Sequence, residues 1–170
     1  CFCFSLQPFF AVGSGFGIFP ISLKKIKPKW SITALEPDRE NVNFIKDFDV
    51  NIKKSFIENF TTTNKFDFIS LNKVVEHLVN PSRVLIKISK FLKKNGIIYI
   101  EVPDADNAYK DKLKFNREEF FADHHHIFSK KSIINIVKET GYKAKIVKQI
   151  KEPSNKYTIY TFLKKKLYEK

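Results

Sequence analysis

One apolar run constrains the fold of this chain more than any other feature of its sequence. Residues 97–102 (IIYIEV) are apolar at almost every position, and Pro103 follows them directly. A strand with one solvent-facing side shows polar residues at every second position, whereas a strand inside a parallel sheet is buried on both faces. The run therefore predicts a parallel sheet that is covered by helices on both sides.

Strand-like and helix-like segments alternate along the rest of the chain. Apolar or β-branched runs predict six further strands: five at residues 9–12, 31–35, 66–71, 142–150 and 157–163, and one within a strand and turn at 51–60. Helical spacing and capping residues predict helices at residues 16–27, 38–47, 81–94 and 130–140. The short connection KEPSN between the last two strands favours an antiparallel hairpin. The predicted fold is α/β, a doubly wound, Rossmann-like seven-stranded sheet that is mostly parallel and ends in an antiparallel hairpin.

The helix patterns also predict particular faces and ends. In the first helix, one apolar stripe is formed by Phe16, Phe19, Leu23 and Ile26. Pro81 should open the third helix, and Asn95-Gly96 should end it, with Phe91 and Leu92 still on its apolar face. Residues 104–128 show neither pattern, and a connection of that length usually serves a function.

The 170 residues suit one domain spanning residues 1–170, with an atypical segment at 1–8 and a frayed tail at 164–170. Because the chain contains no Met, we expect it to be an N-terminally truncated fragment. Cys1 and Cys3 are too close for a favourable disulfide, so we expect free thiols in a reducing compartment, the cytoplasm. The apolar residues 1–12 are too few for a membrane span. Oligomeric state is left open.

The net charge of +13 raises the question of a nucleic-acid partner. Only three of the 31 basic residues are arginines, which leaves 28 lysines. Arginine is the side chain that binds phosphate and guanine with two parallel hydrogen bonds. The chain is also rich in Ile, Asn and Phe, the amino acids of AT-rich codons. We therefore favour a solvated lysine surface over nucleic-acid binding, which stays open as an alternative.

Two features at strand ends predict a ligand that contains adenosine. The first strand runs into Gly13-Ser14-Gly15-Phe16-Gly17, which holds three of the five glycines of the chain. Such a loop lets the backbone turn tightly and approach a ligand, at the N-terminus of the following helix. Glu36 ends the second strand, 19 residues beyond Gly17, where a carboxylate can accept both hydroxyls of a ribose. NAD and S-adenosylmethionine both fit, but the NAD fingerprint needs a glycine at position 18, which is Ile18.

The pattern G-x-G-x-G at residues 13–17 resembles motif I of the class I S-adenosylmethionine-dependent methyltransferases. Three further segments resemble motifs of a small-molecule subgroup of that family, the one similar to methyltransferase domain 23: FDFISLNKVVEHLVNP (66–81), LKKNGIIYIEVPD (92–104) and DHHHIFSKKSI (123–133). The resemblance covers residues 9–163. It implies methyl transfer from S-adenosylmethionine to an oxygen, carbon or nitrogen of a small-molecule acceptor.

The resemblance also implies roles for particular residues. The glycine loop would lie under the methionine part of the cofactor, Glu36 and Pro37 would hold the ribose, and the turn after the third strand would flank the adenine. The backbone just past the fourth strand would lie beside the sulfonium. The implied cofactor-binding residues are Gly13, Ser14, Gly15, Gly17, Glu36, Pro37, Ile57, Glu58, Asn72 and Lys73.

Two departures from the family pattern keep alternatives open. Ala11 stands where the family has an acidic residue, and the segment before it lacks the usual helices that cover the cofactor. A degenerate domain without activity is therefore one alternative. An RNA methyltransferase is another, motivated by the net charge.

The histidines are the remaining candidates for chemistry. His77 follows the fourth strand, and His124 and His126 lie in the long connection. A neutral imidazole near the acceptor can remove its proton as the methyl group arrives, so these three are the candidate catalytic residues. We expect no metal site, because the side chains of the adjacent residues 124–126 diverge.

Overall fold

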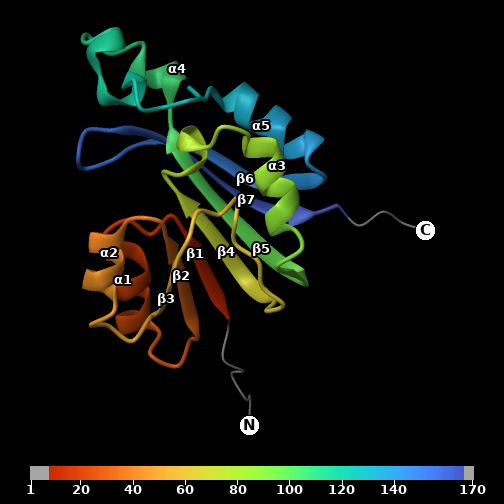
Figure 1. Ribbon diagram of the computed structural model, residues 1–170. Coiled ribbons are helices and arrows are strands. Elements are labelled where there is room, and N and C mark those ends of the chain that lie inside the picture. Colours follow the sequence, from red (N-terminus) through yellow and green to blue (C-terminus); the bar gives the residue numbers. More distant parts are fainter. Residues whose placement is uncertain (1–7, 167–170) are drawn as a thin grey trace.

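The computed structural model describes residues 8–166 as one seven-stranded sheet with helices packed on it (Figure 1). The strand order is β3-β2-β1-β4-β5-β7-β6. The strands are β1 (Phe9–Val12), β2 (Ile32–Glu36), β3 (Asn51–Lys54), β4 (Phe66–Asn72), β5 (Leu92–Pro103), β6 (Tyr142–Lys151) and β7 (Tyr157–Lys165). Strands β1 to β5 are parallel to one another, and β7 is antiparallel to both β5 and β6. The predicted fold class is confirmed, including the C-terminal hairpin.

Helices pack on both faces of the sheet. They are α1 (Ile18–Ile26), α2 (Arg39–Ile45), α3 (Pro81–Ile88), α4 (Ala105–Ala108) and α5 (Lys130–Glu139), with short 3-10 turns η1 (Val75–His77), η2 (Lys114–Asn116) and η3 (Glu118–Phe120). Figure 1 shows α1 and α2 together on one side and α3 and α5 on the other. Side chains of β1 alternate accordingly: Phe10 and Val12 belong to the core with α3 and α5, whereas Phe9 and Ala11 belong to the core with α1 and α2.

Helix α3 is shorter than predicted. It ends at Ile88, and the backbone then turns into β5, where Leu92 pairs with Phe66. Asn95 and Gly96 therefore lie inside a strand and end no helix. Gly96 lies beside a register irregularity in β4, and a Cβ atom there would be 2.7 Å from Leu92 Cδ1 and 3.1 Å from the Asp67 carbonyl oxygen. Close approach of the strands, and not helix capping, explains this glycine.

Helix α1 turns only part of the predicted face to the core. Gly17 is its N-cap, with φ +75°, so the helix starts two residues later than the pattern suggested. Pro20 and Ile21 are buried, whereas Phe16 and Ile26 are 67% and 70% exposed. Leu23 packs against the core and the ring of Phe19 lies 5.8 Å from that of Phe9, so the predicted stripe was wrong only at Phe16 and Ile26. Phe16 falls outside the helix because the glycine-rich turn sets the start of the helix.

The other differences concern the ends and the long connection. Residues 104–128 hold α4, η2 and η3 between short irregular stretches. Lys164 and Lys165 belong to β7 and not to a frayed tail. The rest of the predicted tail from residue 167, the atypical segment up to residue 7, and the two cysteines lie outside the described residues. Among the residues described, no helix is long and apolar enough to cross a membrane.

Candidate functional site

A cleft of about 290 Å³ lies where β1 and β2 end at the carboxyl edge of the sheet. This edge is the switch point of the strand order, where β1 is followed in space by β2 on one side and β4 on the other. Ligands of open α/β sheets bind in such crevices. Seven of the predicted cofactor-binding residues line the cleft: Gly13, Gly15, Glu36, Pro37, Ile57, Glu58 and Lys73.

The carboxylate of Glu36 is fixed in this cleft by backbone donors. The N–H of Gly15 donates to Oε2 at 2.7 Å, and the N–H of Asp38 donates to Oε1 at 3.1 Å. The side chain of Asn41 donates to Oε1 at 3.4 Å, and Glu36 is only 5% exposed. A carboxylate offers about four acceptor positions, so three donors leave capacity for a ligand hydroxyl. The glycine loop and the end of β2 thus hold each other across the cleft.

The three glycines of the loop lack a side chain for different structural reasons. Gly13 has φ +61°, and a Cβ there would be 2.6 Å from Val74 Cγ2, so a larger residue would collide with the segment after β4. Gly15 has φ +52° and no atom within 4 Å of its Cβ position, which faces open space in the cleft. Gly17 lies outside the cleft, and its Cβ would be 2.6 Å from Ile45 Cγ1. Gly15 leaves room for a ligand, whereas Gly17 leaves room for α2.

A second cavity of about 660 Å³ adjoins the first and shares Gly13, Gly15 and Lys73 with it. Ser14 and Asn72, the other two predicted residues at this edge, line it. Among the described residues, Ser14 Oγ and Asn72 Oδ1 are buried without a hydrogen-bond partner. Buried polar atoms are nearly always paired, so these two atoms mark a place where a polar ligand is expected.

Lys73 lines both cavities and brings a positive charge to them. Its φ of +52° and its N–H bond to the Glu101 carbonyl, 2.9 Å long, turn the chain away from β4. Its ammonium lies 3.3 Å from Glu152 Oε1 and 3.7 Å from Glu101 Oε1, and it also bonds the hydroxyl of Thr158. Ala11 also lines the larger cavity, whose carboxylates come from Glu101 and Glu152.

Two of the predicted histidines meet beside the cleft, and the third does not. His77 lies in η1 and lines the cleft, and its ring centroid is 4.9 Å from that of His124. His126 points elsewhere, with Nε2 3.4 Å from the Val79 carbonyl oxygen. Sequence analysis missed Glu76, the partner of this pair. Burial raises the pKa of Glu76 to about 7, although its backbone N–H and Lys73 act in the opposite direction.

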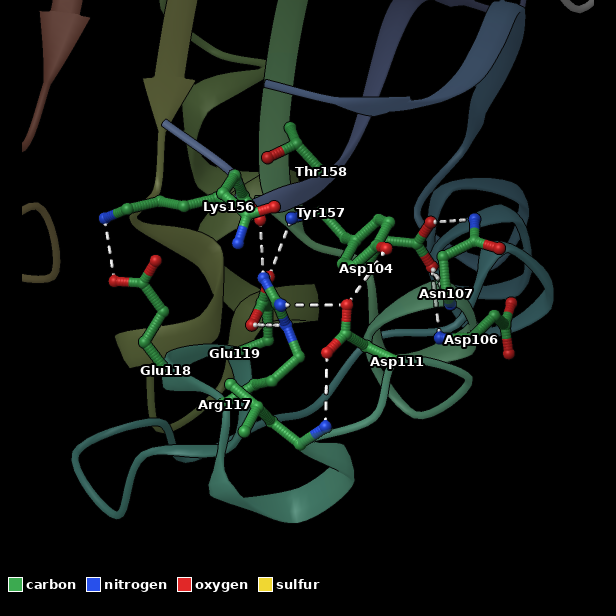
Figure 2. A network of polar contacts seen from close by, with 12 residues as sticks. Asp104, Asp106, Asn107, Asp111, Arg117, Glu118, Glu119, Lys156, Tyr157 and Thr158 are labelled. Carbon is green, nitrogen blue, oxygen red and sulfur yellow. Dashed lines mark hydrogen bonds and ion pairs between the residues drawn. The ribbon is translucent and has the colours of Figure 1, made fainter. Parts of the chain in front are cut away.

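A polar network is built on Arg117 (Figure 2), and its members Glu119 and Tyr157 line the same cavity as His77 and His124. The guanidinium bonds both oxygens of Glu119 at 2.9 and 3.0 Å, lies 3.3 Å from Asp111, and stacks over the ring of Tyr157. It also donates to the carbonyl of Asn155 at 2.6 Å. The network ties residues 111–119 to the turn of the β6–β7 hairpin. No sequence pattern marked it, although Arg117 is one of only three arginines.

Comparison with known proteins identifies the family. A family model described as a methyltransferase domain matches residues 11–147. This chain belongs to that methyltransferase family. An uncharacterised protein of Methanocaldococcus jannaschii is 31% identical over 83 residues, which are 46% of this chain and 39% of the archaeal protein. This chain therefore spans well under two thirds of that curated relative.

Solved structures of methyltransferases share the fold of this family member. The plantazolicin methyltransferase BpumL, crystallised with a monoazolic desmethylPZN analog and S-adenosylhomocysteine, superposes with a TM-score of 0.77 at 15% identity, over 94% of this chain and 76% of that one. An S-adenosylmethionine-dependent methyltransferase of Thermotoga maritima gives a TM-score of 0.74 at 19% identity, over 94% and 82% of the two chains. The family predicted from the motifs is confirmed.

Proposed function

We propose that this chain transfers a methyl group from S-adenosylmethionine to a small-molecule acceptor. Family membership and the likeness to methyltransferases crystallised with S-adenosylhomocysteine support the cofactor. The structurally similar BpumL was crystallised with a monoazolic desmethylPZN analog beside S-adenosylhomocysteine. That complex supports an acceptor smaller than a nucleic acid.

The carboxylate of Glu36 carries most of this proposal. It is held by the N–H of Gly15 and faces the cleft at the end of β2, where its remaining acceptor position can take a hydrogen bond from a ribose hydroxyl. Ile57 gives the cleft an apolar wall that suits a purine ring, with Glu58 next to it. The unpartnered Ser14 Oγ and Asn72 Oδ1 in the adjoining cavity suit the polar end of the methionine part. The residues present therefore fit the cofactor.

The protein's own contribution is alignment more than activation. The cofactor supplies a methyl group that its sulfonium has already activated. The glycine loop, Asn72 and Lys73 line the two cavities that would hold the cofactor, and so would keep its methyl group in place for attack in line by the acceptor. Uptake of the acceptor proton by His77 or His124 stays a prediction, as does such a role for His126.

Calorimetric titration with S-adenosylhomocysteine tests the proposal, with NAD as the competing ligand. We expect micromolar binding of S-adenosylhomocysteine alone. The variant Glu36→Gln should weaken binding by about 10-fold or more, because it loses a charge-assisted hydrogen bond worth roughly 1.5–3 kcal/mol. The matched control Glu40→Gln, an exposed residue of α2, should bind like the parent.

Two results would contradict the proposal. One is binding of NAD in place of S-adenosylhomocysteine, and the other is the absence of binding by a chain whose circular dichroism shows it to be folded. The acceptor class needs a separate assay, in which labelled cofactor is offered with small-molecule extracts or with total RNA. Label in the RNA would replace the small-molecule acceptor by a nucleic acid.

A further inference from the structure

Three potential metal ligands converge beside the cofactor cleft. Glu76 and His77 come from η1, directly after β4, and His124 comes from the long connection 104–128. One ligand atom of each residue lies within 4.8 Å of the others. Ligand atoms on one tetrahedral Zn²⁺ are roughly 3.4 Å apart, because each bond is about 2.0–2.2 Å long. A small rotation of the side chains therefore brings the three onto one ion.

The two imidazoles are already held in the tautomer that a metal needs. Nδ1 of His77 lies 3.2 Å from the carbonyl oxygen of Asp123, and Nδ1 of His124 lies 3.2 Å from that of Glu119. A carbonyl oxygen only accepts, so the ring proton is on Nδ1 in both cases. The lone pair is then on Nε2. Metal-bound histidines almost always donate their other ring N–H in this way.

The burial of Glu76 is an independent observation that points to a ligand of this cluster. The residue is only 1% exposed, and both of its carboxylate oxygens are buried with no hydrogen-bond partner among the described residues. An unpaired carboxylate in such a place is costly, and buried charges are normally paired or coordinate metals. A bound cation gives these two oxygens their partner.

The charges around the three residues favour a bound cation over a bound anion. Two lysines line the cavity of Glu76 and His124, and both are already paired: Lys73 with Glu101 and Glu152, and Lys156 with Glu118. Asp123 lies within 4.0 Å of a ring nitrogen of each histidine and adds negative charge. The Arg117 network of Figure 2 bonds the side chain of Glu119, whose carbonyl orients His124.

We propose that Glu76, His77 and His124 form a binding site for a divalent transition-metal cation of the Zn²⁺ type. Two imidazoles and one carboxylate are the ligand set of open zinc sites, in which a fourth position is left for water or substrate. The expectation of no metal site rested on the adjacent residues 124–126, whose side chains diverge. The fold instead pairs one of them with two residues nearly fifty positions earlier.

The open position of the ion would face the cleft, because His77 lines both the cofactor cleft and the cavity of about 270 Å³ that holds Glu76 and His124. If methyl transfer is the function, on which this step rests, an acceptor oxygen would bind there. Metal binding then excludes the role of His77 and His124 as bases, since each Nε2 has one lone pair.

Zinc titration of the untagged chain tests the site without any measure of activity. The background variant Cys1→Ser/Cys3→Ser removes thiolates, which also bind Zn²⁺. Calorimetry should show one equivalent of Zn²⁺, and Zn²⁺ should raise the melting temperature. Glu76→Gln or His124→Gln should weaken binding at least about 100-fold, since even outer partners of a metal site contribute roughly 10–100-fold. The matched control is the exposed neighbour His125: the variant His125→Gln should bind Zn²⁺ as tightly as the background variant does.

Equal binding by Glu76→Gln and the background would overturn the site and assign the zinc to surface histidines. The absence of saturable binding would overturn it as well. Circular dichroism of each variant separates loss of ligand from loss of fold. Neither Glu76 nor His124 lines the cofactor cleft, so both variants should still bind S-adenosylhomocysteine. Failure of zinc binding and failure of cofactor binding are thus observed separately.

Discussion

Replacing Arg117 by methionine should lower the free energy of unfolding by about 3–5 kcal/mol, which is the cost of leaving one member of a buried ion pair without its partner. Glu119 is 2% exposed and would keep only the bond from the N–H of Tyr157, 2.7 Å long. The carbonyl of Asn155 and the carboxylate of Asp111 would also lose a donor. At roughly 2–4 °C per kcal/mol for a chain of this size, the melting temperature should fall by about 6–20 °C.

Urea unfolding followed by far-ultraviolet circular dichroism measures this loss. The double variant Arg117→Met/Glu119→Gln should recover roughly 1–3 kcal/mol of it, because no charge is then left buried while the amide oxygen of the substituted side chain still accepts from the N–H of Tyr157. The exposed Arg39→Met is the matched control and should change stability by less than about 0.5 kcal/mol. A double variant that is no more stable than Arg117→Met would refute the assignment of the loss to an unpaired Glu119.

Three further predictions concern other parts of the molecule. Burial raises the pKa of Glu119, but the bonds from Arg117 and from the N–H of Tyr157 lower it by more, so the folded-state pKa lies below the ordinary value. The stability that this lowered pKa contributes is fully present above pH about 4.3 and is lost as the pH falls through the folded-state pKa. Urea midpoints should therefore fall less steeply with acid in the double variant than in the parent. Gly96→Ala should destabilise by about 1–3 kcal/mol in the same assay, because its Cβ meets Leu92 and the Asp67 carbonyl. Gly15→Ala should cost only about 1–2 kcal/mol of stability for its positive φ, yet abolish calorimetric binding of S-adenosylhomocysteine.

The predictable parts of the fold are those that a short, continuous stretch of sequence determines. The run at 97–102 predicted a strand buried on both faces, and the capping pattern predicted a helix at 130–140, which is α5 with Ser129 as its N-cap. The end of α3 was not predictable in the same way. Asn95-Gly96 is a good helix-ending signal, but pairing of Leu92 with Phe66 had already drawn the chain into β5. Tertiary pairing overrode local propensity there.

The same division holds for the site. Gly15 and Glu36 were predictable because strand ends meet at one edge of a parallel sheet, which brings residues 21 positions apart into a hydrogen bond. Glu76 was not, because its importance comes from burial and from a histidine 48 positions later. In the sequence it is one of many charged residues in a chain that is 29% charged. Only the folded chain shows that it has no partner among the described residues.

The long connection 104–128 links these two observations. Its backbone carries His124 to η1, and its Arg117 bonds the hairpin turn at Asn155, so the site depends on contacts between three distant segments. The hydrogen bonds between Arg117 and Glu119 are buried, which makes this part of the arrangement specific in geometry and costly to disturb. A loop held only by apolar contacts could slide without loss, but a bidentate arginine fixes its register. The network therefore fixes the position of a segment that shows neither helix nor strand periodicity in the sequence.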